Sequence, residues 1–174
     1  LLLGGLFWSV GKWGTRALVS LLDYSVDQSL GELAGAELFS EDDYCTNPIL
    51  LDAVQEIIAR LSKEVDEDFL PLTVHVIDSP EVNAFAFPGG QMFVLTGLLE
   101  KLNSPAELAG ILGHEIGHVV NRHGLIGLAR SMWFQLTFSL VLGDIAGPGG
   151  GLSALASNIA LLKFSRDQET ESDL

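Results

Sequence analysis

Apolar residues recur every three or four positions along most of this chain, the spacing that places them on one face of a helix. Runs with this spacing predict helices at residues 25–38, 48–65, 105–123, 125–142 and 152–164. Only in the middle of the chain does the pattern change to short β-branched and aromatic runs. The sequence therefore predicts a mainly helical domain with a small central sheet.

Residues typical of helix ends support three of these helices. Ser25-Val26-Asp27-Gln28 and Ser104-Pro105-Ala106-Glu107 both resemble capping boxes, in which the first and fourth side chains bond to backbone N–H groups. Asn47-Pro48 supplies a cap and a first-turn proline for the helix that follows. Gly124 is expected to end the helix that begins at Pro105.

The central strands are bounded by turn residues. Residues 72–77 are β-branched and lie between prolines, which predicts a strand, and the lone His75 on it is expected to be structural. The runs at 83–87 and 91–96 flank Pro88-Gly89-Gly90, which predicts a hairpin. The hairpin edge either belongs to the core or offers backbone groups to an extended peptide. The predicted fold class is α+β, with a small antiparallel sheet beside the third helix.

Two parts of the chain have features relevant to membranes. Residues 1–24 are apolar with two basic residues near their middle, which fits an amphipathic helix that packs on its own domain or, alternatively, lies on a membrane. Residues 125–142 and 152–164 fit buried helices or a hairpin that dips into a membrane. We divide the chain into this N-terminal segment (1–24) and a domain (25–174).

Composition excludes some functions and leaves others open. The net charge is −14, with nine Lys and Arg against 23 Asp and Glu, which argues against a nucleic-acid partner because basic residues carry phosphate binding. Cys45 is the only cysteine, so an intrachain disulfide is impossible. Hydrophobic residues make up 48% of the chain, which leaves membrane contact open. The chain begins at Leu1 and not at Met, so we expect a piece of a longer polypeptide.

The sequence His114-Glu115-Ile116-Gly117-His118 carries the clearest chemistry. Histidines at i and i+4 lie one above the other on the same helical face, so both imidazoles can reach one metal ion. Zinc is the expected ion, at one per chain. Glu115 points elsewhere on the helix, which leaves its carboxylate free to act as a general base.

A hydrolytic zinc site has three protein ligands, so a third must come from elsewhere. The longer H-E-x-x-H-x-x-G-x-x-H pattern requires glycine and histidine where the chain has Asn121 and Gly124. His123 lies about 140° around an unbroken helix from the second motif histidine, so it cannot share the ion. Glu169 and Asp173 are i and i+4 near the C-terminus, so one carboxylate can bind zinc while the other accepts the second N–H of a ligand histidine.

Three motifs together resemble a known family. They are H-E-I-G-H followed by Arg122-His123, N-A-F-A-F-P-G-G at residues 83–90, and S-R-x-x-E-x-x-x-D at residues 165–173. In this order they resemble the zinc metallopeptidases grouped with CAAX prenyl protease 1, HtpX, BepA and Oma. The resemblance runs from about Asn47 to the C-terminus.

The chain departs from the family pattern at two places. Ser172 stands where family members usually have alanine, a small change that is not expected to disturb ligation. Family domains also continue beyond the last motif, whereas this chain ends at Leu174. We therefore expect a zincin-like metallopeptidase domain that is truncated at its C-terminus.

The resemblance implies a role for each motif residue. It implies that His114, His118 and Glu169 bind zinc, that Glu115 is the general base, and that Asp173 supports a ligand histidine from the second shell. It also implies that the edge of the hairpin aligns a polypeptide substrate as an added strand, through Asn83, Ala84, Phe85 and Ala86.

These roles imply a zinc metalloendopeptidase for unfolded, misfolded or membrane-associated proteins, located at a membrane, in the bacterial cell envelope. Two alternatives remain open. One is a zinc-bearing, catalytically silent chaperone or assembly factor of the same fold, which proteolytic activity distinguishes. The other is a structural membrane-associated helical protein with an accidental H-E-x-x-H, which metal analysis distinguishes.

Overall fold

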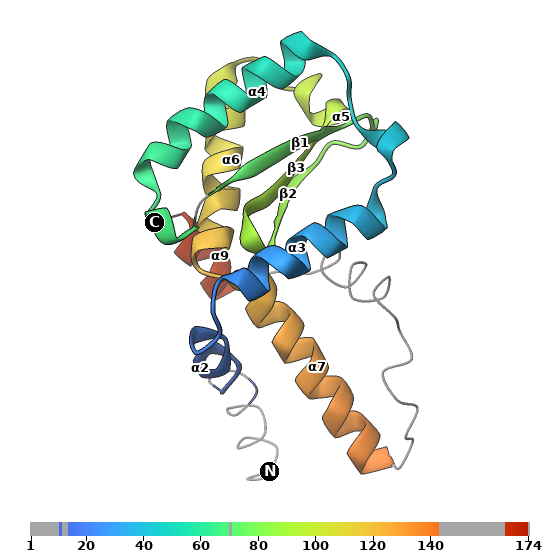
Figure 1. Ribbon diagram of the computed structural model, residues 1–174, viewed down its shortest axis with the longest axis vertical. Coiled ribbons are helices and arrows are strands. Elements are labelled where there is room, and N and C mark those ends of the chain that lie inside the picture. Colours follow the sequence, from blue (N-terminus) through green and yellow to red (C-terminus); the bar gives the residue numbers. More distant parts are fainter. Residues whose placement is uncertain (1–10, 12–13, 70, 143–165, 174) are drawn as a thin grey trace.

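The computed structural model describes residues 11, 14–69, 71–142 and 166–173 (Figure 1). Its α-helices are α2 (Thr15–Ser20), α3 (Ser25–Leu38), α4 (Pro48–Leu61), α5 (Thr96–Leu99), α6 (Pro105–Val120), α7 (His123–Leu142) and α9 (Arg166–Ser172). Its strands are β1 (Thr73–Ile77), β2 (Ala84–Phe87) and β3 (Gln91–Leu95). The predicted α+β class and the mainly helical content are confirmed. The helix predicted at 152–164 and half of the segment 1–24 lie outside the described residues.

The sheet contains the predicted hairpin and one further strand. β2 pairs antiparallel with β3, and Gly89 and Gly90 in the turn between them have φ of 74° and 79°, which favours glycine. β1 pairs with the other side of β3 and runs parallel to it, so the sheet is mixed and not purely antiparallel. The strand order β1-β3-β2 leaves β2 at an edge.

Helices cover both faces of this sheet (Figure 1). α4 and α6 pack on the face that carries Met92 and Val94, while α3 and the start of α7 pack on the face that carries Phe93. Alternate residues of β3 therefore enter two separate apolar clusters. Phe93 lies at the centre of an aromatic group and stacks on His75 with ring centroids 5.0 Å apart. His75 also bonds to Gln91 at 2.8 Å, as expected of a structural residue.

Several predicted helix ends are confirmed and two are wrong. Asn47 caps α4 by accepting from the Ile49 N–H, and Ser104 caps α6 by accepting from the Glu107 N–H. Ser25, in contrast, lies inside α3, because the preceding Asp23 carboxylate accepts from the Ser25 N–H and the helix starts one residue earlier than a Ser25 cap requires.

The junction between α6 and α7 differs from the prediction that Gly124 ends the first helix. α6 stops at Val120, and α7 begins again at His123. Arg122 adopts a left-handed conformation, with φ of 53°, that non-glycine residues rarely occupy. Its guanidinium donates to the Val19 carbonyl and forms an ion pair with the buried Asp27. These contacts offset the cost of the left-handed turn, so no glycine is required there.

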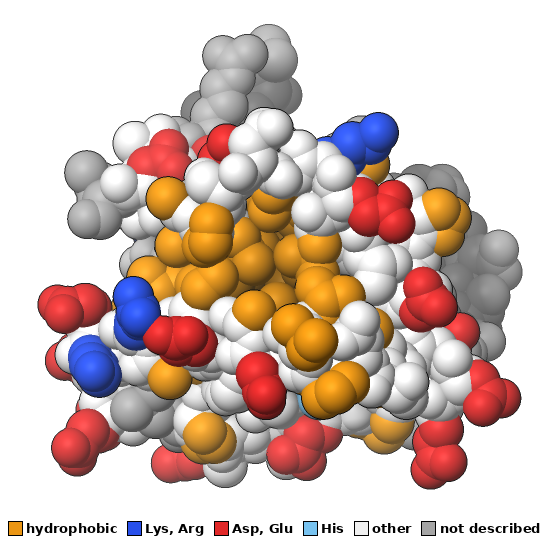
Figure 2. Space-filling model, turned by 90° about the horizontal axis from the view of Figure 1, so that it is seen from above, with side chains coloured by type: hydrophobic (Ala, Val, Ile, Leu, Met, Phe, Trp, Pro, Cys, Tyr) orange, Lys and Arg blue, Asp and Glu red, His pale blue; other side chains and the backbone are white. Residues whose placement is uncertain are grey.

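The surface reflects the acidic, apolar composition. Figure 2 views the end of the molecule that carries α4 and α5, and it shows apolar side chains gathered in a hollow, with acidic side chains around them and few basic ones. Leu18 and Leu21, at the N-terminal end of the described chain, expose 56% and 83% of their surface. Within the described ranges, none of the helices has the length and hydropathy needed to cross a membrane.

Candidate metal and catalytic site

The site is built where the C-terminal helix α9 crosses α6. His114, Glu115 and His118 lie on α6, and Glu169 lies on α9. Gly117 allows the two helices to approach closely, because a Cβ there would lie 2.5 Å from the Ser172 carbonyl oxygen and 2.7 Å from its Cα. The glycine inside the H-E-x-x-H motif is therefore the residue that lets α9 bring its carboxylates to the histidines.

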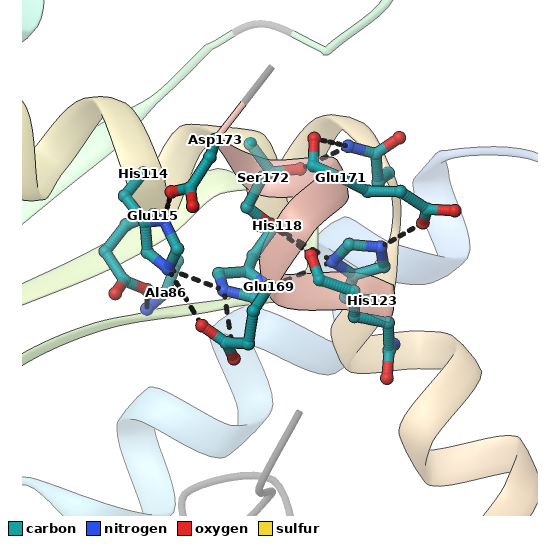
Figure 3. A network of polar contacts seen from close by, with 12 residues as sticks. Ala86, His114, Glu115, His118, His123, Glu169, Glu171, Ser172 and Asp173 are labelled. Atoms are coloured by element: carbon teal, nitrogen blue, oxygen red, sulfur yellow. Dashed lines mark hydrogen bonds and ion pairs between the residues drawn. The ribbon is translucent and has the colours of Figure 1, made fainter. Parts of the chain in front are cut away.

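Three of the predicted side chains converge on one point (Figure 3). The Nε2 atoms of His114 and His118 are 3.1 Å apart. The Glu169 carboxylate lies 3.3 Å from the first of these nitrogens and 3.8 Å from the second. Among the described residues, this is the group of His, Cys, Asp and Glu side chains whose ligand atoms lie close enough to hold a metal ion.

The outer nitrogen of His114 contacts the predicted second carboxylate. His114 Nδ1 lies 2.8 Å from Asp173 Oδ1. Because an ionised carboxylate only accepts hydrogen bonds, the proton of the neutral imidazole is on Nδ1. The lone pair of His114 Nε2 then faces Glu169 and the second histidine.

The outer nitrogen of His118 contacts a residue to which the sequence had assigned no role. His118 Nδ1 lies 2.9 Å from His123 Nδ1, and His123 Nε2 lies 2.9 Å from the Glu171 carboxylate. Arg16 from α2 binds both oxygens of the same carboxylate, at 3.1 Å and 2.7 Å. His123 is completely buried and His118 is 3% exposed, whereas Arg16 and Glu171 are about one-third exposed.

This arrangement of acceptors fits a bound cation. Two imidazole Nε2 atoms and a carboxylate face one another, and an Nε2 atom that carries no proton can bind a metal ion through its lone pair. Tetrahedral zinc with bonds of about 2.0–2.2 Å requires ligand atoms about 3.3–3.6 Å apart. The distances of 3.1, 3.3 and 3.8 Å in this group lie within about 0.2 Å of that range.

Burial and neighbouring charges shift the pKa values in the directions that such a site needs. Burial, followed by the charges of His123 and His114, lowers the pKa of His118 to about 4, so this histidine is neutral at neutral pH. Burial also lowers the pKa of His123. Hydrogen bonds from Arg16 and His123 lower the pKa of Glu171 to about 2, so this carboxylate stays ionised. Neutral imidazoles and ionised carboxylates are the forms that bind metals.

Glu115 points away from the three acceptors and toward strand β2. Its Oε2 accepts a hydrogen bond from the Ala86 N–H at 3.1 Å. Burial raises the pKa of the Glu115 carboxyl to about 7, although His114 and the Ala86 N–H favour the ionised form. A carboxyl with this pKa can take up and release a proton near neutral pH.

The four residues predicted to bind substrate differ in the direction of their backbone groups. The Leu95 N–H donates to the Asn83 carbonyl at 3.1 Å, and the antiparallel register then turns Asn83 and Phe85 toward β3. Ala84 and Ala86 turn their backbone groups toward the outer edge of β2, where the Ala86 N–H meets Glu115. Two of the four residues therefore offer backbone groups at the edge of the sheet.

The sequence analysis missed the roles of His123, Glu171 and Arg16. The sequence carries a signal for His123, which is a third histidine five residues after His118. Helical spacing on an unbroken helix nevertheless turns it away from His118, so the sequence alone does not predict a hydrogen bond between them. The turn at Arg122 breaks the helix and brings the two imidazoles together.

An H-E-x-x-H helix crossed by a helix whose glutamate faces both histidines, beside a small sheet with β2 at its edge, is the arrangement typical of a zincin-type metallopeptidase domain. The comparison with family models agrees. The model for peptidase family M48 matches residues 50–174, and the chain belongs to this family.

Individual relatives cover different shares of the chain. The beta-barrel assembly-enhancing protease of Yersinia pestis is 30% identical over 92% of this chain, and that of Escherichia coli K12 is 29% identical over 88%. The mitochondrial metalloendopeptidase OMA1 of Arabidopsis thaliana is 40% identical over 58%. The chain spans only 35%, 34% and 20% of the length of these relatives.

Proposed function

We propose that this chain is the catalytic part of a zinc-dependent metalloendopeptidase. His114, His118 and Glu169 hold one zinc ion, and Asp173 orients His114. The observation that carries the proposal is the convergence of the two imidazole Nε2 atoms and the Glu169 carboxylate, at distances of 3.1–3.8 Å. Membership of a peptidase family supports the same activity.

When bound, zinc supplies Lewis-acid chemistry, which makes water a better acid and a peptide carbonyl a better electrophile. Glu115 takes the proton that the attacking water loses and passes it to the amide nitrogen that leaves. Its raised pKa, about 7, suits both transfers. The Ala86 N–H holds the Glu115 carboxylate between β2 and the histidines, so the base lies at the strand where substrate is proposed to bind.

The proposed substrate is a polypeptide in extended conformation, added as a strand to the edge of β2. The Ala84 N–H and the carbonyls of Ala84 and Ala86 provide the outward backbone groups for this pairing, because the Ala86 N–H donates to Glu115. Strand addition reads backbone groups more than side chains, which suits unfolded or misfolded proteins.

We also propose that the protein works at a membrane, in a bacterial cell envelope. The exposed Leu18 and Leu21 near the N-terminus support membrane contact. Two bacterial relatives are named for β-barrel assembly, which supports a location in the cell envelope. Co-sedimentation with vesicles of bacterial lipids tests the contact, and binding that is unchanged when both leucines are replaced by glutamine contradicts this role for them.

Replacing Glu115 by glutamine tests the mechanism. The variant is expected to retain one zinc per chain and to lose at least about 100-fold in the hydrolysis of fluorescently labelled casein, because the base is removed while the ligands remain. Glu107→Gln is the matched control, since Glu107 is an exposed glutamate on the same helix. Turnover by Glu115→Gln equal to that of the control contradicts the assignment of the base.

The same assay separates the peptidase from its alternative. A wild-type chain that binds zinc and casein but does not cleave casein would be the silent chaperone of this fold. A wild-type chain that binds no zinc contradicts both functions.

A further inference from the structure

The second motif histidine is supported by a set of residues that the proposed mechanism does not use. We call Arg16, Glu171 and His123 the His123 chain. We propose that His123 is a positioning residue. Glu171, held by Arg16, keeps His123 in one tautomer, and His123 in turn fixes the proton of His118 on Nδ1. This inference rests on the proposed function, because it concerns how His118 is prepared for the metal.

The direction of each hydrogen bond in the His123 chain can be derived by starting from Arg16. Arg16 has only donors, and it binds both oxygens of the Glu171 carboxylate. That carboxylate has only acceptors, so the bond of 2.9 Å to His123 requires a proton on His123 Nε2. A neutral His123 then has a lone pair on Nδ1. The bond of 2.9 Å between the two Nδ1 atoms therefore takes its proton from His118.

The consequence for His118 is a single tautomer and a fixed ring orientation. With its proton on Nδ1, His118 directs the lone pair of Nε2 toward His114 and Glu169. In the opposite tautomer the Nε2 proton would occupy the position of the metal. A hydrogen bond to the outer nitrogen of a ligand histidine is a general way to fix its orientation and tautomer.

Burial explains why a protein group supports His118 here. Ser172, a polar side chain near the pair, donates to the Gln168 carbonyl at 3.0 Å and lies 3.4 Å from His123 Nδ1. Both histidines are almost completely buried, so a missing partner is not readily replaced by bulk water. His123 is thus placed to be the acceptor that the His118 Nδ1–H requires.

The His123 chain also connects three separate segments of the fold. Arg16 comes from α2, His123 is the first residue of α7, and Glu171 comes from α9. His123 reaches His118 only because the left-handed Arg122 turns the chain between α6 and α7. The contacts of Arg122 with the Val19 carbonyl and with Asp27 hold this turn from the N-terminal side.

The test compares two replacements of His123 in the whole chain. His123→Leu removes both hydrogen bonds, while His123→Gln offers a carbonyl to the His118 Nδ1–H and an amide N–H to Glu171. Zinc affinity is measured by competition with a chromophoric chelator. We expect affinity to fall by roughly 10- to 100-fold in His123→Leu, and His123→Gln to recover most of it. His75→Leu is the control, because it removes a hydrogen-bonded histidine on β1, outside the metal group.

A second measurement reads the tautomer directly. In ¹⁵N-labelled, zinc-loaded wild type, long-range proton–nitrogen correlations are expected to place the His118 proton on Nδ1. The Co²⁺-substituted protein should show a visible absorption spectrum that changes in His123→Leu and returns with His123→Gln. If His123→Leu does not fold by circular dichroism, Glu171→Ala replaces it, since Glu171 is about one-third exposed and can be removed without opening a buried cavity.

The outcomes separate this inference from the proposed function. Wild-type zinc affinity in His123→Leu, or in Glu171→Ala where it replaces that variant, overturns the positioning role and leaves the peptidase proposal intact. An equal loss in the leucine and glutamine variants also overturns it, because hydrogen bonding would then not be the cause. A wild-type chain without zinc overturns the proposed function itself.

Discussion

The two histidines of the H-E-x-x-H motif are equivalent in the sequence, but the structure supports them differently. The Nδ1 of His114 meets Asp173, a carboxylate whose side chain is 70% exposed. The Nδ1 of His118 meets His123, which is fully buried and is backed by Glu171. One of the two proposed zinc ligands is therefore oriented at the surface and the other in the interior.

This difference predicts how much each hydrogen-bond partner contributes to zinc affinity. Water can replace an exposed carboxylate as the acceptor for the His114 Nδ1–H, although with poorer orientation. Water does not readily enter between His118 and His123, and hydrogen bonds are stronger in the less polar interior. We therefore expect His123 to contribute more to zinc affinity than Asp173 does. The H-E-x-x-H motif itself does not predict this difference.

Glu169→Ala removes the carboxylate that faces both histidines, the proposed third zinc ligand, and it has the largest expected effect. Losing one of three protein ligands from a site with a binding free energy of about 10–16 kcal/mol forfeits a few kcal/mol, on the order of 1,000-fold in affinity. Elemental analysis of the purified chain is expected to show one zinc in wild type and little in the variant. An unchanged zinc content would remove Glu169 from the ligand set.

Gly117→Ala tests whether the close approach of α9 to α6 is needed to place Glu169 and its neighbouring carboxylates beside the histidines. The new methyl group meets the Ser172 backbone, so α9 must move away and take Glu169 and its neighbouring carboxylates with it. The loss of zinc affinity is expected to lie between that of Glu169→Ala and the roughly 10- to 100-fold cost of removing one outer partner.

Gly113→Ala is the matched control for this change. An added Cβ at Gly113, four residues earlier on α6, meets nothing within 4 Å. Alanine there should keep zinc and stabilise the helix by about 0.5–1 kcal/mol in thermal unfolding. Equal zinc affinity in the two alanine variants would show that the close approach of α9 is not required.

Local sequence signals predicted much of the fold and the convergence of the two motif histidines. Asn47 and Ser104 cap helices in the way their sequence context predicts, and the two glycines after Pro88 mark the hairpin turn. The spacing of His114 and His118 reflects helix geometry alone, so both were predicted to face one point.

The remaining parts depend on contacts between distant residues. Gly124 was predicted as the helix end because glycine favours the left-handed conformation, yet Arg122 adopts it, supported by Asp27 from 95 residues earlier. His123 could not be assigned without knowing where that turn lies. The parallel pairing of β1 likewise depends on how the chain crosses the sheet, which strand composition does not specify.

Asp173→Ala has the smallest expected effect and is the direct test of the comparison. Removing the exposed partner of His114 should weaken zinc binding by about 10-fold, near the lower end of the range for outer partners of metal-bound histidines. His123→Leu, measured with the same chelator, should lie nearer the upper end. Because the two variants act on different ligand histidines, their ratio reports how each is supported. A larger loss in Asp173→Ala than in His123→Leu would mean that exposure does not set the value of these hydrogen bonds and that the surface carboxylate is the main support of the site.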